Sequence, residues 1–83
     1  MAYNIDELAS SCNILLKKLF FLCNNSMITK DQLLENSRLK AKFLIDNLEN
    51  IQSAEVKEEA IINLNNFLTF ISMEEIEGWF YNS

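Results

Sequence analysis

The chain of 83 residues contains no proline, no histidine and a single glycine, Gly78. Because proline and glycine are the residues that most strongly interrupt helices, a chain almost without them can be helical over nearly its whole length. The absence of histidine removes the side chain best suited to proton transfer near neutral pH, which is also the commonest metal ligand. The sequence therefore favours a helical fold and disfavours catalysis.

Other catalytic and ligand-binding motifs are missing as well. Without histidine there is no serine–histidine or cysteine–histidine pair for nucleophilic catalysis, and two cysteines alone do not make a zinc site. A single glycine cannot build a phosphate-binding loop. The adjacent carboxylates Glu58 and Glu59 fall near a predicted helix start, where acidic residues commonly complement the helix dipole. We expect a protein that is not an enzyme and that needs no cofactor and no metal.

The two cysteines, Cys12 and Cys23, fall on one predicted helix. At a rise of about 1.5 Å per residue they lie roughly 16 Å apart along it. A disulfide needs Cα atoms within about 7 Å, so a bond within the chain is excluded unless the helix is broken. The simplest interpretation is two small apolar residues in the core, with free thiols that fit a reducing cytoplasm.

Basic residues are scarce, since seven lysines and arginines stand against twelve acidic residues and give a net charge of −5. Such a chain repels the phosphate backbone of nucleic acids and the headgroups of anionic lipids. The most apolar stretch, from Ile14 to Cys23, contains two lysines and is far shorter than the roughly 20 residues of a membrane span. We expect it not to be part of a targeting segment, because Asp6 and Glu7 precede it in place of a basic region and no small-residue cleavage site follows it. We therefore predict a cytoplasmic protein with no nucleic-acid partner and no membrane insertion.

Helix start signals divide the chain into segments. Four residues can cap a helix N-terminus: Asn4, Thr29, Ser53 and Ser72. All but Ser53 are followed three positions later by Glu or Gln, which is the spacing of a capping box. They predict helices at about residues 5–23, 30–50, 54–71 and 73–81. The connections are short, which favours antiparallel packing of consecutive helices. The fold class we predict is all-α: one domain over residues 1–83, a small antiparallel bundle of three main helices with a short C-terminal helix closing one end.

Apolar residues recur at helical spacing and define the faces that should be buried. The predicted core includes Leu15, Leu16, Phe20, Leu33, Leu44, Ile45, Ala60, Ile61, Phe67 and Leu68, with Ser37 inside the stripe of the second helix.

Four large apolar residues fall off these stripes. Ile14 and Phe21 are seven positions apart on the back of the first helix, and Leu39 and Phe43 are four apart on the back of the second. Paired apolar residues make surface patches that often bind other proteins. Three explanations remain open: the two helices are buried more centrally than a simple bundle requires, the patches form a self-interface, or they bind a different protein.

The C-terminal aromatic residues are a second candidate site, because Trp and Tyr are enriched among the residues that dominate binding energies. Trp79 and Tyr81 follow Gly78, which is a candidate for ending the last helix as its C′ residue. Either this segment folds back onto the core, or it is an ordered tail that reaches a partner.

The function predicted is that of a small protein-binding module, acting as a homodimer, which regulates or inhibits a protein partner by steric occlusion. Its proposed interface residues are Ile14, Phe21, Leu39, Phe43, Trp79 and Tyr81.

The eleven asparagines, with many Ile and Lys, suggest an AT-rich genome such as that of a low-GC bacterium or its phage, where the protein would inhibit a host system. An immunity-type or structural bundle that shields a membrane target from a toxin is the alternative. A DNA-binding regulator is disfavoured, because Arg38, Lys40 and Lys42 form no continuous basic face.

Overall fold

The computed structural model describes the backbone of residues 4–81 and the side chains of residues 4–78. Four α-helices and one turn of 3-10 helix make up the chain. In chain order they are α1 (Ile5–Asn24), α2 (Lys30–Asn47), the 3-10 turn η1 (Leu48–Asn50), α3 (Ala54–Phe67) and α4 (Met73–Tyr81). No strand occurs in the described part of the chain, and the all-α prediction is confirmed.

Each helix begins where its cap was predicted. The Asn4 side chain accepts a hydrogen bond from the backbone N–H of Asp6, and the Ser53 hydroxyl accepts one from Val56. Thr29 and Gln32 form a complete reciprocal capping box at the start of α2. These bonds satisfy backbone donors that have no partner inside the helix, so the four starts are determined locally.

The helix α1 ends without glycine or proline. Its terminal carbonyls are satisfied by a backbone arrangement in which Met27 N–H donates to Leu22 at 2.8 Å and Ser26 N–H donates to Cys23 at 3.1 Å. Ser26 has a φ of 60°, the left-handed conformation that this Schellman arrangement requires and that glycine usually supplies. A tight reversal of the chain follows, which sends α2 back along α1.

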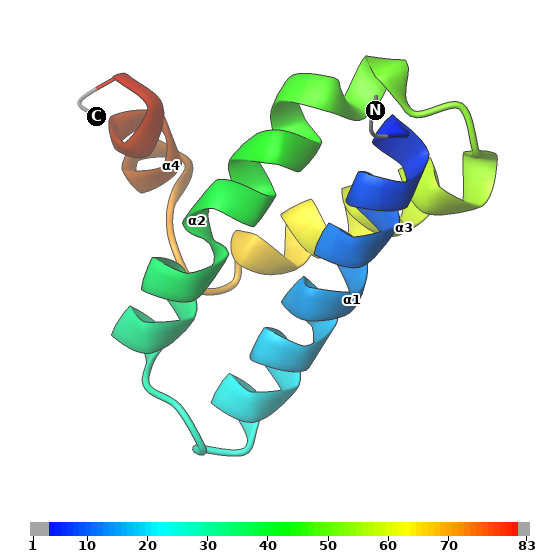
Figure 1. Ribbon diagram of the computed structural model, residues 1–83. Helices are drawn as coiled ribbons and strands as arrows, with labels where there is room; N and C mark the ends of the chain where they lie inside the picture. Colours follow the sequence, from blue (N-terminus) through cyan, green and yellow to red (C-terminus); the bar gives the residue numbers. More distant parts are fainter. Residues whose placement is uncertain (1–3, 82–83) are drawn as a thin grey trace.

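The three long helices form an up-down-up bundle (Figure 1). The helices α1 and α2 are antiparallel and pack extensively, while α3 runs in the same direction as α1. That direction is fixed at three levels, by contacts of Asp6 with the chain just before α3, of Asn13 with Asn63, and of Phe20 with Phe67. As a result α1 is the central helix, packed against both of the others.

The core lies between these helices and contains most of the predicted residues. Its buried apolar members are Ala9, Leu16, Phe20, Leu33, Ala41, Leu44, Ile51, Ala60, Phe67 and Ile71. Three aromatic rings meet in it: the Phe20 ring packs edge-on against Phe67, with centroids 5.2 Å apart, and stacks on Phe70 at 5.5 Å. Offset and edge-on ring pairs of this kind stabilise beyond their buried area.

The margins of the core were predicted wrongly. Leu15, Ile45, Ile61 and Leu68 all belonged to predicted buried stripes, yet all four are exposed. The helix α3 was also expected to reach residue 71 and ends at Phe67. Beyond it the chain turns so that Phe70 stacks on Phe20 and Ile71 enters the core. Tertiary packing therefore overrides helix propensity at this end.

The short helix α4 does not close an end of the bundle as expected. It stands on the side of α2 away from α1 (Figure 1), and Ile76 is its residue packed against the core. The chain continues helically through Gly78 to Tyr81 with no positive φ at the glycine, which confirms the predicted helix at about residues 73–81 and excludes Gly78 as its end. The helix α4 thus borders a surface rather than sealing the core.

The carboxylate of Asp6 links the start of α1 to the start of α3, and its loss should destabilise the bundle. Its two oxygens accept hydrogen bonds of 2.9 Å from the backbone N–H groups of Gln52 and Ser53. We expect Asp6→Ala to lower the free energy of unfolding by about 1–2 kcal/mol, as for the loss of a charged cap. Urea denaturation followed by circular dichroism measures this change.

The matched control is Glu7→Ala, which removes an exposed acid from the same first turn of α1. It should change stability by less than about 0.5 kcal/mol. Equal effects of the two substitutions would contradict a specific role for Asp6 and reduce it to a general interaction with the helix dipole.

Candidate protein interaction surfaces

The outer face of α1 carries two of the predicted interface residues, both largely exposed to solvent. Ile14 is 65% exposed and Phe21 is 62% exposed, and two helical turns separate them on one face. The exposed Leu15 lies about a third of a turn away and is not part of this strip. We call Ile14 and Phe21 the α1 face. Neither α2, α3 nor α4 covers it, so burial against another helix of the bundle does not explain these residues.

The two predicted residues on the back of α2 differ from one another. Leu39 is 77% exposed, the most exposed large apolar residue among the described side chains. Phe43, by contrast, is partly buried and packs against the core. The structure therefore separates the pair that the sequence grouped together.

The side chains of Trp79 and Tyr81 lie outside the described residues. The backbone at both positions belongs to α4. Whether the two aromatic rings contribute to an interface stays a prediction.

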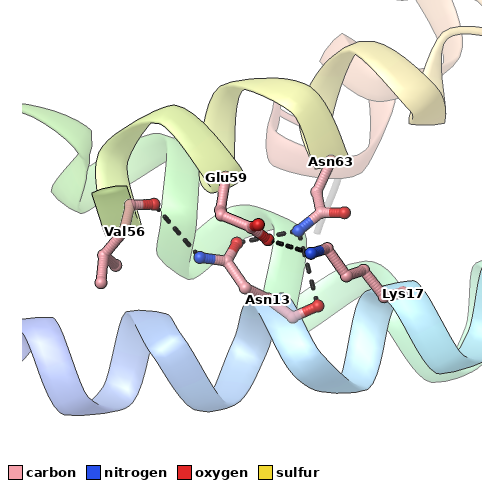
Figure 2. A network of polar contacts seen from close by, with 5 residues as sticks. All are labelled: Asn13, Lys17, Val56, Glu59 and Asn63. Atoms are coloured by element: carbon pink, nitrogen blue, oxygen red, sulfur yellow. Dashed lines mark hydrogen bonds and ion pairs between the residues drawn. The ribbon is translucent and has the colours of Figure 1, made fainter. Parts of the chain in front are cut away.

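A polar network between α1 and α3 was not predicted (Figure 2). The Asn63 amide donates to the side-chain oxygen of Asn13 at 2.9 Å, and the Asn13 amide donates to the Val56 carbonyl at 3.2 Å. Lys17 and Glu59 form an ion pair beside them at the surface. Asn13 and Asn63 are both buried. Their positions carried a signal, because each falls on the apolar stripe of its helix where a core residue was due.

The network lines one wall of a shallow hollow of about 330 Å³ between α1 and α3. Its lining mixes charged and apolar groups, including Lys17, Glu59 and Ile14. The side-chain oxygen of Asn63 accepts no hydrogen bond from the described residues, and in Figure 2 it points away from Asn13. The polar groups therefore serve mainly to hold α1 and α3 in register.

An apolar groove lies on the opposite side of the bundle, between α2, α3 and α4. Its volume is about 310 Å³, and its lining is formed by Ile45, Leu64, Asn65, Leu68, Met73 and Ile76. Leu68 is 43% exposed and Met73 is 59% exposed, so the groove is open to solvent. Asn65 is the one polar residue of this lining. We call this groove the α2–α3–α4 groove.

The helix α4, which forms one border of this groove, carries three acidic residues. Over residues 1–57 seven acidic residues balance the seven basic ones, and the remaining acids are Glu58, Glu59, Glu74, Glu75 and Glu77. Glu59 pairs with Lys17 at the hollow between α1 and α3. Glu74, Glu75 and Glu77 are exposed on α4 and add negative charge to one border of the groove.

The cysteines remain free thiols, both partly buried. Burial raises the pKa of the Cys12 thiol above its ordinary value, and the Lys40 ammonium opposes this shift only in part. Cys12 is therefore protonated at neutral pH and is not an activated nucleophile. Among the side chains of residues 4–78, no three cysteine or carboxylate groups lie together as metal ligands.

None of the helices in the described part of the chain combines the length and the apolar character that a membrane span requires. Comparison with protein-family models, with curated proteins and with solved structures finds no match for this chain.

Proposed function

We propose that this protein is a non-enzymatic binding module that regulates or inhibits a protein partner by occupying part of its surface, and that it acts in the cytoplasm as a homodimer. The observation that carries the proposal is the α1 face, where Ile14 and Phe21 are exposed on the most central helix of the bundle. A helix whose inner side is fully occupied and whose outer side still carries large apolar residues is typical of a protein-binding surface.

The α1 face offers two large apolar side chains that can anchor an interface. Burying a phenylalanine or isoleucine side chain is favourable by about 1.5–3 kcal/mol, so Phe21 and Ile14 can act as anchors. A standard interface buries roughly 800 Å² on each partner. That is a modest fraction of the accessible surface of this chain, 5781 Å². A dimer formed through α1 would therefore leave most of the molecule, including the α2–α3–α4 groove, available to a further partner.

The self-interface is tested by light scattering coupled to size exclusion over a wide range of concentrations. We expect the wild-type protein to form a dimer and Phe21→Asp to be a monomer, because a carboxylate cannot be buried without a partner. Asn36→Asp is the matched control, since Asn36 is an exposed polar residue on α2 and lies outside the α1 face. It should remain dimeric. Dimers of equal stability in both variants would show that the α1 face is not the self-interface.

Protein binding itself is tested with a photo-crosslinking amino acid placed at Phe21 or at Leu39 in the cells that encode the protein. We expect covalent adducts with a protein from at least one of these exposed positions. Glu55, an exposed polar position on α3, is the control and should give none. Absence of adducts at both apolar positions would overturn the proposed function.

A further inference from the structure

We propose that the α2–α3–α4 groove binds an amphipathic helix of another protein, with apolar side chains in the groove and lysine or arginine on its flanks. The proposal rests on the proposed function, since it names the partner chemistry of a protein-binding module. It concerns a different surface from the α1 face, and the two can therefore fail separately.

The shape and lining of the groove fit the apolar side of a helix. Its lining comes from three helices and the turn after α3: Ile45 from α2, Leu64 and Asn65 from α3, Leu68 from the turn, and Met73 and Ile76 from α4. Grooves of this kind bind helices through anchors spaced three, four and seven residues apart. The hollow between α1 and α3 has charged residues in its lining and does not offer this chemistry.

The charge around the groove selects the flanks of the partner. The helix α4 contributes Glu74, Glu75 and Glu77, and no lysine or arginine occurs after Lys57. Met73 and Ile76, which face the groove, alternate with these acids along the same helix. A bound helix therefore meets apolar side chains in the centre and the three exposed acids of α4 at one border, which favours lysine or arginine on the side of the partner that lies along α4.

A second copy of this chain is the competing occupant, because Lys17 and Lys18 lie beside Ile14 and Phe21 on α1. That helix contributes no residue to the groove, which lies on the other side of α2 and α3. If one copy placed its α1 face in the groove of another, the resulting pair would still have one empty groove and one uncovered α1 face. Such a head-to-tail contact would propagate into growing oligomers instead of closing as a dimer. A separate protein satisfies the groove without this consequence.

The experiment uses a fluorescent synthetic helix of about 18 residues, built from leucine, alanine and lysine with the leucines on one face. Fluorescence anisotropy measures its binding to the full chain, and an otherwise identical peptide with glutamate in place of lysine is the charge control. We expect the basic peptide to bind and the acidic one to bind at least about tenfold more weakly, with an affinity for the basic peptide that falls as salt is added.

Two groove variants locate the binding. Leu68→Asn and Met73→Asn each remove an exposed apolar contact without adding charge, so the fold should be kept, as circular dichroism can verify. Each is expected to weaken binding of the basic peptide about tenfold or more. The matched control, Leu39→Asn, removes a still more exposed leucine outside the groove and should leave the affinity unchanged. Glu74→Gln combined with Glu77→Gln should flatten the salt dependence.

Three results would overturn the proposal: no binding of the basic peptide, equal binding to the wild-type chain and to both groove variants, or oligomers that grow with concentration and disappear in Leu68→Asn. The last result would assign the groove to a second copy. Phe21→Asp separates this inference from the proposed function, because it should abolish the dimer and leave peptide binding intact. If the basic peptide fails to bind while Phe21→Asp still abolishes the dimer, the groove proposal is overturned and the proposed function is not.

Discussion

Replacing Phe67 with alanine should remove a large part of the stability of this chain. The Phe67 side chain is buried, and its ring is packed edge-on against Phe20 at the point where α1 and α3 meet. Truncating a buried phenylalanine costs about 3–5 kcal/mol. A chain of this size has a free energy of unfolding of roughly 4–12 kcal/mol, and small domains lie toward the low end. Urea denaturation followed by circular dichroism should therefore show an unfolding midpoint close to zero denaturant.

The control for Phe67 is Leu39→Ala, which truncates a large apolar residue that is mostly in solvent. Its effect should stay within about 0.5 kcal/mol of the wild-type value. If both substitutions shifted the midpoint equally, the aromatic contacts at the end of α3 would not be part of the stabilising core.

The starts of the helices were predictable because they depend on neighbours in the sequence. Thr29 and Gln32 satisfy each other's backbone groups within three residues, and that geometry needs no tertiary contact. The end of α3 was not predictable for the converse reason. Phe70 and Ile71 leave the helix to reach Phe20 and the core, and the sequence around them contains neither proline nor glycine to announce the turn.

Periodicity located the centre of each buried face but not its edges. Leu16 and Leu44 are completely buried, whereas Leu15 and Ile45, one position along, are exposed. The width of a buried stripe depends on where the adjacent helix lies, which a single helix does not encode. The same reason explains Phe43. Its angular position predicts exposure on an isolated helix, and packing against the core buries it in part.

The candidate surfaces also differ in whether one helix or several helices form them. The exposure of Ile14, Phe21 and Leu39 could be predicted because they lie nearly opposite the buried stripes. The groove could not, since three separate helices form it and two of its residues, Ile45 and Leu68, were assigned to the core. The charge asymmetry was present in the sequence, but a net charge of −5 does not reveal that residues 58–83 carry all of it.

The two proposed surfaces are compatible with each other in a single assembly, a dimer that still binds a further partner. The α1 face is apolar with lysines beside it, and the groove is apolar with glutamates beside it, on opposite sides of a thin bundle. Self-association through α1 would place two acidic grooves facing outward. Such a dimer would present two copies of the same site to a basic partner, which strengthens binding wherever the partner is itself repeated.

The buried pair Asn13 and Asn63 should show strong energetic coupling. Either Asn13→Ala or Asn63→Ala breaks the 2.9 Å hydrogen bond and leaves the remaining amide partly unsatisfied in the core. Each single substitution is expected to cost about 2–3 kcal/mol. The double substitution leaves no orphaned partner, so its cost should fall below the sum of the two by about 1–2 kcal/mol. Urea denaturation of the four proteins gives this double-mutant cycle.

The neighbouring ion pair provides the comparison for this cycle. Lys17 and Glu59 join the same two helices, but their side chains are 52% and 41% exposed. An ion pair in that environment contributes only about 0–1 kcal/mol, so the cycle of Lys17→Ala with Glu59→Ala should be nearly additive, and more so at high salt. Additive costs for the asparagines, or stronger coupling for the ion pair, would contradict the view that buried hydrogen bonds hold α1 and α3 in register. Coupling confined to the asparagines would mean that the parallel alignment of α1 and α3 is fixed by two polar residues at the centre of an otherwise apolar interface.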